Sequence, residues 1–371
     1  MNLDVNHRLT RDRLDEHAAL QLLTKAPLGE LMAAAHAERT RRFPEGRVTF
    51  VFDTNPNYTN VCVTQCRFCA FCRRPEDPQA YTLSPEQVAA KVRNAADLGA
   101  TTVLLQGGHN PKVGLQEWLA YIRAIRSVCP QIHIHPFSPA EYVFMARQEQ
   151  ANIRAILEAV YAEGVDTIPG GGAEILTETV RRRIAPAKAS TEQWLEVCAT
   201  AHEIGFRTTA TMMFGHVESD ADIVEHLLQL RRLQDRTGGF TSFIAWSFKP
   251  GDNPLGKEVP VTVHPAKYVR IIALSRLVLD NFHHIQSSWF SENVAAGQLG
   301  LLAGADDFGG ILVEENVLQQ AGHERTTTAE KVKTIIRRAG FTPAQRDSHY
   351  NVLQAFQGPQ PIGLTAEQNL P

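Results

Sequence analysis

The sequence has no long basic run, no excess of positive charge and no long apolar segment. Its 37 Lys and Arg against 40 Asp and Glu give a formal net charge of −3 at pH 7. Because the basic residues are also spread evenly, nothing favours binding to nucleic acid or to an anionic membrane. No segment near Met1 has the apolar core of a signal peptide, and no apolar run approaches the ~20 residues that span a bilayer. We therefore expect a cytoplasmic protein.

Cysteine is scarce and unevenly placed. Of six cysteines, Cys129 and Cys198 stand alone in helix-like surroundings, and the other four lie between residues 62 and 72. We interpret the two isolated cysteines as ordinary buried thiols. In a reducing compartment, the four close cysteines indicate a metal site and not disulfides.

The clustered cysteines have a C-x3-C-x2-C spacing at Cys62, Cys66 and Cys69, with Cys72 three residues further on. Thiolates in so short a loop converge on one point. Two kinds of site fit this pattern. Three thiolates would hold an iron–sulfur cluster with one iron left open, whereas all four would complete a structural zinc site.

Strand-like and helix-like segments alternate through the chain. This alternation predicts an α/β fold, a (β/α)8 TIM-type barrel of ~250 residues, with an open doubly wound sheet as the alternative. The expected strands are 47–52, 101–105, 132–136, 165–169, 207–213, 241–246, 283–289 and 303–308. The expected helices are 84–98, 115–128, 141–163, 191–204, 219–236, 264–281 and 293–302.

The barrel is favoured because nearly every expected strand ends in chemically unusual residues. Examples are the cysteines themselves, Gln106-Gly107-Gly108 and Pro169-Gly170-Gly171-Gly172. Active sites of such barrels are assembled from the carboxyl ends of several strands.

Segments outside the barrel are expected to pack on it as parts of one domain. Residues 1–46 form an N-terminal extension with two amphipathic helices, and residues 47–321 form the barrel. Residues 322–371 form a C-terminal helical extension, with one helix at about 328–339 and a second, polar helix after Pro343.

The cysteine loop, with Phe68 just before its third cysteine, resembles the cluster loop of the radical S-adenosylmethionine (radical SAM) superfamily. The resemblance implies a 4Fe-4S cluster on Cys62, Cys66 and Cys69. It also implies that the open iron is chelated by the amino and carboxylate groups of S-adenosyl-L-methionine (SAM).

Further residues enter the implied SAM site. Gln106-Gly107-Gly108 resembles the glycine motif whose carbonyls hold the SAM ammonium, and Glu174, after the second glycine-rich segment, would accept hydrogen bonds from SAM. Phe68 and Ser138 complete this set. Without the resemblance, both glycine segments predict only turns.

The resemblance can be narrowed to one branch of the superfamily. Segments 57–60, 68–71, 168–174, 209–218, 306–310 and 314–316 resemble the enzymes that cyclise dehypoxanthine futalosine on the futalosine route to menaquinone. This implies an oxidoreductase that forms a carbon–carbon bond. A flavodoxin- or ferredoxin-like donor supplies one electron, and a 5′-deoxyadenosyl radical then abstracts hydrogen from C4′ of the substrate ribose. The carbon radical adds to the benzoate ring, which finally loses a proton and an electron.

Three alternatives stay open. Aminofutalosine synthase and the FO synthase components share the cysteine loop and would use the same fold. A chain that only binds iron–sulfur or zinc, without SAM chemistry, is the non-enzymatic alternative.

The implied substrate is a carboxylate with a free ribose, so its site needs a cation or N–H donors and hydroxyl partners. His216 and Glu218 are the candidate catalytic bases for the final deprotonation. We assign no role to His133 and His135, and favour a solvated helix face for residues 181–183. The candidates for binding the substrate are Arg73, Ser138, Thr211, His216, Ser287, Ser288, Glu314 and Glu315.

Cys72 departs from the family, in which a tyrosine usually follows the Ala-Phe pair. We predict that Cys72 is not a cluster ligand, because a fourth thiolate would occupy the iron that SAM needs.

Overall fold

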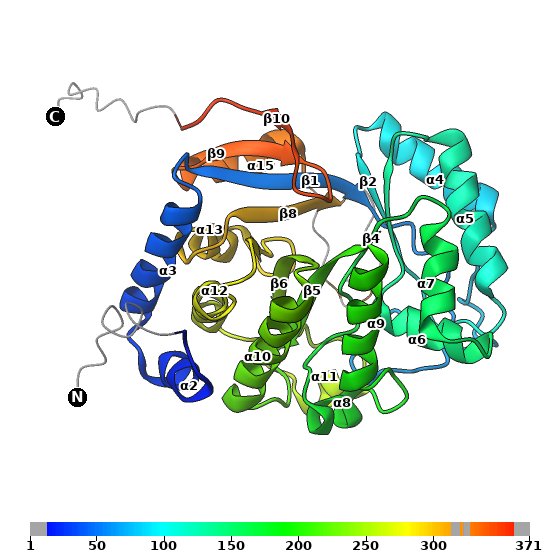
Figure 1. Cartoon of the computed structure of the whole chain (residues 1–371), viewed down its shortest axis with the longest axis horizontal. Helices are drawn as coiled ribbons and strands as arrows, with labels where there is room; N and C mark the ends of the chain where they lie inside the picture. Colours follow the sequence, from blue (N-terminus) through cyan, green and yellow to red (C-terminus); the bar gives the residue numbers. More distant parts are fainter. Residues whose placement is uncertain (1–12, 313–319, 321, 323–326, 360–371) are drawn as a thin grey trace.

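The computed structural model describes residues 13–312, 320, 322 and 327–359. Its centre is a barrel of parallel strands surrounded by helices (Figure 1), so the predicted (β/α)8 architecture is confirmed. The strands are β1 (Arg47–Thr54), β2 (Thr102–Leu105), β3 (His133–Pro136), β4 (Thr167–Ile168), β5 (Arg207–Phe214), β6 (Phe240–Ser247), β7 (His284–Ser287) and β8 (Asp307–Leu312).

The helices follow the strands and cover the outside of the barrel. They are α4 (Pro85–Asp97), α5 (Leu115–Val128), α6 (Pro139–Gln148), α7 (Ile153–Tyr161), α8 (Glu178–Ile184), α9 (Thr191–Ile204), α10 (Asp220–Thr237), α11 (Pro254–Glu258), α12 (Pro265–Val278) and α13 (Val294–Leu302). Helix α4 begins with the capping box expected from its sequence, since Ser84 and Gln87 cap each other's backbone N–H groups. No helix in the described part of the chain is long and apolar enough to cross a membrane.

A single helix over 141–163 was the wrong prediction, because the chain forms α6 and α7 there. Gln150 takes a left-handed φ of +51°, which ends α6. Asn152 then begins α7, and its side chain accepts a hydrogen bond from the Ala155 N–H at 2.8 Å. The hydrophobic period continues across this break, so it conceals the boundary.

The barrel has a seam between β3 and β4. Within the described residues, β3 pairs only with β2, and β4 pairs only with β5. Side chains bridge the seam instead: Nε2 of His133 and Nδ1 of His135 lie 2.6 and 2.8 Å from the Thr167 hydroxyl. Both histidines therefore have structural partners at this position.

The C-terminal segment extends the sheet. Helix α15 (Ala329–Arg338) confirms the first predicted helix, but the helix predicted after Pro343 is wrong. That region forms β9 (Thr342–Arg346), which lies beside β1 in Figure 1, and β10 (Val352–Ala355), which pairs with β9. Strand β9 pairs in parallel with the first half of β1, whereas β2 pairs only with the end of β1. The first half of β1, which β2 leaves unpaired, supplies hydrogen-bond partners to β9. This tertiary pairing outweighs the local helix preference of the segment after Pro343.

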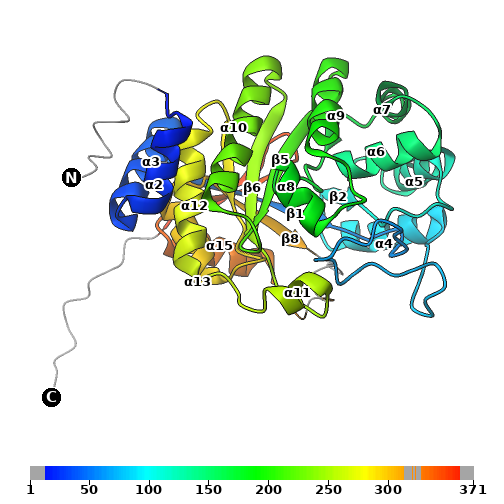
Figure 2. The same ribbon diagram turned by 90° about the horizontal axis from the view of Figure 1, so that it is seen from below.

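The two predicted N-terminal helices are present as α2 (Glu16–Lys25) and α3 (Leu28–Arg42). Figure 2 shows them beside α12, on the outside of the barrel. Arg13, ahead of α2, forms ion pairs of 2.7 Å with Asp235 and 2.6 Å with Asp280. These contacts fasten the segment to α10 and to the chain after α12.

Candidate active site

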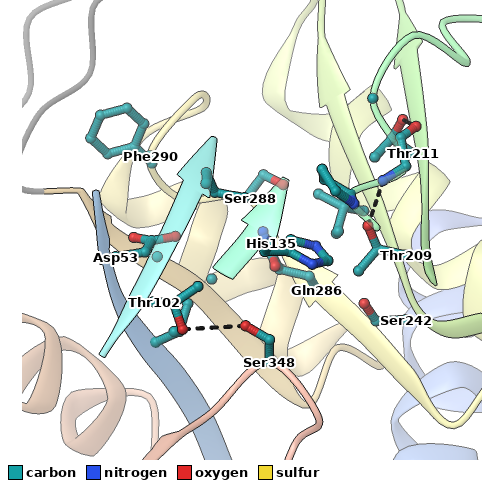
Figure 3. Close-up of a pocket in the computed structure, with 18 of the residues that line it drawn as sticks. Asp53, Thr102, His135, Thr209, Thr211, Ser242, Gln286, Ser288, Phe290 and Ser348 are labelled. Atoms are coloured by element: carbon teal, nitrogen blue, oxygen red, sulfur yellow. Dashed lines mark hydrogen bonds between the residues drawn. The ribbon is translucent and has the colours of Figure 1, made fainter. Parts of the chain in front are cut away.

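A cavity of about 420 Å³ lies inside the barrel. It extends from residues that follow the strands, such as Gln106 and Gly170, to Thr102 and Ser242 near the strand starts. Figure 3 shows polar side chains from several strands around the same hollow. Much of the remaining wall is apolar, with Ile244 and Phe308 among its residues.

The end of β9 and the segment that follows it close the end of this cavity near Thr102. Arg346, Ser348 and Tyr350 line it, and the Ser348 hydroxyl lies 3.2 Å from that of Thr102. Nε and Nη2 of Arg346 donate to the two carboxylate oxygens of Asp307 at 2.5 and 3.0 Å. The sequence did not indicate that residues so far along the chain would reach the barrel interior.

The three spaced cysteines lie half-buried in a loop that the backbone anchors on both sides. The Cys62 N–H donates to the Arg73 carbonyl at 3.0 Å, and the Arg67 N–H donates to the Ile184 carbonyl at 2.8 Å. Burial raises the pKa of the Cys66 thiol to about 12, with the charge of Lys188 opposing this shift and those of Cys69 and Cys62 adding to it. A cationic metal centre bound in this loop would stabilise the thiolate form of the buried Cys66.

Cys72 lies next to this group. Its Sγ donates to the Cys69 carbonyl at 3.7 Å. A hydrogen bond from its thiol also lowers the pKa of Cys69 to about 6. Cys72 therefore has a role open to it that does not require a bond to metal, and its exclusion from the ligand set stays a prediction.

Gly107 and Gly108 pack against the segment that leads into the cysteines. A Cβ on Gly108 would lie 2.1 Å from the Val61 carbonyl oxygen, and one on Gly107 would lie 2.6 Å from the Tyr58 ring. The Gly108 N–H also donates to the Thr59 carbonyl at 2.9 Å. The glycines are thus required for close backbone approach, whatever ligand the loop binds.

Glu141 connects several predicted site residues, and the sequence interpretation missed it. Its carboxylate accepts hydrogen bonds from the Tyr58 hydroxyl and the Gly107 N–H, both at 3.1 Å. It also accepts from the N–H and hydroxyl of Ser138, both at 2.7 Å. The spacing Ser138-Pro139-Ala140-Glu141 is that of a capping box and could have revealed this residue. Because the Ser138 hydroxyl is engaged here, Ser138 positions Glu141.

Glu174 has a left-handed φ of +47° and is buried. Its Oε1 accepts from Nζ of Lys188 at 2.7 Å. Burial lowers the pKa of Lys188, but the charges of Glu174 and Cys66 outweigh burial and raise it above its ordinary value. Lys188 also lies over the Phe68 ring, so this second missed residue connects Phe68, Glu174 and the cysteine loop.

The predicted solvated face at 181–183 is wrong for Arg181. Its guanidinium is buried and donates to the carbonyls of Gly172, Ala173 and Ala189. Arg181 therefore fixes the glycine-rich segment before Glu174. Arg182 and Arg183 are exposed, as expected.

His216 and Glu218 are not among the described residues that line the cavity. The carboxylate of Glu218 accepts from the N–H groups of Gly215 and His216 at 2.6 and 2.8 Å. Nδ1 of His216 accepts from the Val217 N–H at 2.7 Å. Both side chains thus stabilise the turn after β5, and their catalytic role stays a prediction.

Besides Ser138 and His216, described above, the substrate-binding candidates fall into three groups. Thr211 and Ser288 line the cavity. Arg73 donates to carbonyls of the cysteine loop, and the Ser287 hydroxyl donates to the Gly297 carbonyl at 2.8 Å, so both are engaged elsewhere. Glu314 and Glu315 lie outside the described residues.

Two family models match the chain: the radical SAM superfamily over residues 56–230 and the CofH/MqnC C-terminal region over residues 237–358. A cyclic dehypoxanthine futalosine synthase from Streptomyces coelicolor is 39% identical over 94% of this chain and 87% of its own. A 5-amino-6-(D-ribitylamino)uracil–L-tyrosine 4-hydroxyphenyl transferase from Methanopyrus kandleri is also 39% identical, over 92% of this chain and 94% of its own.

The fold is also similar to solved structures. The crystal structure of methylornithine synthase superposes with a TM-score of 0.70 at 18% identity, and covers 91% of this chain and 96% of that one. At this identity the likeness concerns the fold alone.

Proposed function

Because the chain belongs to the radical SAM superfamily, in the group with a CofH/MqnC C-terminal region, we propose that it cyclises dehypoxanthine futalosine for menaquinone synthesis. The observation that carries the proposal is the largely apolar barrel cavity, whose rim residue Gln106 precedes the glycines in contact with the cysteine loop. Such a cavity suits a carbon radical, which must be kept from water and from other hydrogen donors.

In this proposal Cys62, Cys66 and Cys69 hold a 4Fe-4S cluster. When bound, the cluster and SAM supply the 5′-deoxyadenosyl radical that abstracts hydrogen from C4′ of the substrate ribose. The SAM site comprises the residues predicted for it: Phe68, Gln106, Gly107, Gly108, Ser138 and Glu174. A flavodoxin- or ferredoxin-like protein is the proposed reductant.

In this proposal the residues of the chain hold the reacting groups in position and keep water away from the radical. Glu141 and Arg181 hold the two glycine-rich segments by hydrogen bonds to their backbone. Thr211 and Ser288 offer polar contacts within the cavity, and aromatic side chains of its wall, such as Trp289 and Phe308, would hold the ribose carbon near the benzoate ring. Holding reacting carbons close to contact converts an addition between two groups into an effectively unimolecular step.

The test uses the full chain reconstituted anaerobically with iron and sulfide. With SAM, dehypoxanthine futalosine and a low-potential reductant, we expect 5′-deoxyadenosine and a product lighter than the substrate by two hydrogen atoms. Cys66→Ala should form neither. Release of 5′-deoxyadenosine without the lighter product would contradict the proposed substrate.

The equal identity to the Methanopyrus kandleri transferase favours a second candidate, transfer of a 4-hydroxyphenyl group from tyrosine to 5-amino-6-(D-ribitylamino)uracil. The same preparation should be offered these two compounds with SAM. Product from this pair alone would assign the second function. Offering the aminofutalosine synthase substrates in parallel tests that alternative.

A further inference from the structure

Asp53, near the carboxyl end of β1, is the only carboxylate among the described residues that line the cavity. Its side chain faces the same hollow as His135 and Gln286 (Figure 3). The residue is only 6% exposed. Its Oδ1 accepts no hydrogen bond from any residue that the structure describes.

The neighbours of Asp53 do not use its charge to build the fold. Arg346, the only arginine or lysine among the described cavity residues, directs two N–H groups to Asp307. Gly310 on β8 leaves space for the carboxylate, since a Cβ there would lie 2.5 Å from Oδ1 of Asp53. Burying a carboxylate oxygen without a hydrogen-bond partner is costly, and such groups often serve a bound ligand.

Asp53 is also suited to accept a proton. Burial raises its pKa to about 7; the charge of Arg346 partly opposes this shift and that of Asp307 adds to it. His135 is the histidine among the described residues of the cavity wall. Burial holds its pKa well below the ordinary value. A general base is most effective when its pKa lies near the working pH, so Asp53 is the better base of the two.

We propose that Asp53 is the catalytic base that takes the proton lost by the benzoate ring as the ring regains aromaticity. This inference rests on the proposed function. After the C4′ radical has added to the ring, one ring carbon carries both the new C–C bond and a hydrogen. That C–H bond breaks, the proton moves to the Asp53 carboxylate, and the remaining unpaired electron passes to a one-electron acceptor of the iron–sulfur class.

If Asp53 is the base, Asp53→Asn should uncouple SAM cleavage from formation of the cyclised product. Asparagine has the same shape as aspartate but cannot take the proton. Hydrogen abstraction should continue, so 5′-deoxyadenosine should still form with SAM and substrate. Cyclised product per 5′-deoxyadenosine should fall about 10²-fold or more, the usual contribution of a general base. Asp53→Glu should recover part of the ratio.

Two further readouts separate a base from a group that only binds substrate. Calorimetry on the reconstituted protein with SAM but without reductant should give substrate Kd values for wild type and Asp53→Asn within about threefold. Electron paramagnetic resonance of Asp53→Asn, frozen during turnover, should show an organic radical that the wild type does not accumulate. A tenfold weaker Kd, with 5′-deoxyadenosine and product falling together, would make Asp53 a binding residue and overturn the proposal.

Asp166→Asn is the matched control, because Asp166 is an exposed carboxylate at the start of β4, where it pairs with His349 at 3.2 Å. It should keep the wild-type product ratio. Wild-type product together with an unchanged ratio in Asp53→Asn would overturn the role of Asp53 alone. Wild-type protein that cleaves SAM without cyclising the substrate would overturn the proposed function, and this inference with it.

Discussion

Nζ of Lys188 lies 2.7 Å from Oε1 of Glu174 and 5.3 Å from the centre of the Phe68 ring. Both partners belong to the proposed SAM site, and all three side chains come from different loops. Lys188 therefore fixes the orientation of Glu174 while it remains buried.

Lys188→Met should weaken SAM binding about 10- to 100-fold, since a charge-assisted hydrogen bond contributes about 1.5–3 kcal/mol. Isothermal titration of the reconstituted protein with SAM measures the change. Lys267→Met removes an exposed 3.4 Å pair with Asp220 and is the control. Equal affinities in both variants would show that Glu174 does not need Lys188.

The proposed set of cluster ligands predicts the iron content of alanine variants in the cysteine loop. Alanine at Cys62, Cys66 or Cys69 should reduce iron after anaerobic reconstitution to near zero, whereas Cys72→Ala should retain about four irons per chain, as a 4Fe-4S cluster requires. Iron analysis and the visible absorption spectrum give the result. Loss of iron in Cys72→Ala would make Cys72 a ligand.

Gly108→Ala should destabilise the fold and disturb the cluster site. Its new methyl group would lie 2.1 Å from the Val61 carbonyl oxygen, which cannot move without shifting the cysteine loop. Overpacking of this kind typically costs about 1–3 kcal/mol. Denaturant unfolding checks the stability, and Gly29→Ala, in α3 with nothing within 4 Å, should be neutral or stabilising. Similar results for the two glycines would contradict the close approach.

Arg346→Met should lower the free energy of unfolding by about 3–5 kcal/mol, because it leaves the buried Asp307 carboxylate without its cationic partner. The control is Arg182→Ala, whose exposed pair with Glu178 should contribute no more than about 1 kcal/mol. Urea denaturation of both proteins measures the difference. A small effect at Arg346 would mean that its ion pair with Asp307 contributes little to the stability of the fold.

Asp53 makes folding stability depend on pH. Its pKa rises from 3.8 to about 7 on folding, so between these values the folded state holds a proton that the unfolded state has lost. Stability from this group is therefore full below pH 4 and decreases as the pH rises towards 7. Asp53→Asn removes the dependence, so its melting temperature relative to wild type should rise from pH 5 to pH 8. A constant difference across that range would contradict the shift.

Much of the fold was predictable because the hydrophobic period and the helix caps are local. Ser84 and Gln87 marked the start of α4, and the strand ends were recognisable by their glycines and cysteines. The two wrong predictions, the helix after Pro343 and the single helix over 141–163, have causes that the local sequence pattern does not show. Strand β9 forms only because β1 offers a free edge, and the break at Gln150 depends on a single residue inside a continuous hydrophobic pattern.

The sequence alone predicted the chemistry of the cysteine loop, since three thiols at fixed short spacing are expected to converge, and its motifs identified the family. The tertiary structure decided which other residues meet them. Glu141, Lys188 and Asp53 are separated from one another by dozens of residues, and no spacing rule connects them. They acquire roles only because parallel strands bring their carboxyl ends together, and burial then decides which charges are paired and which one is left facing the cavity.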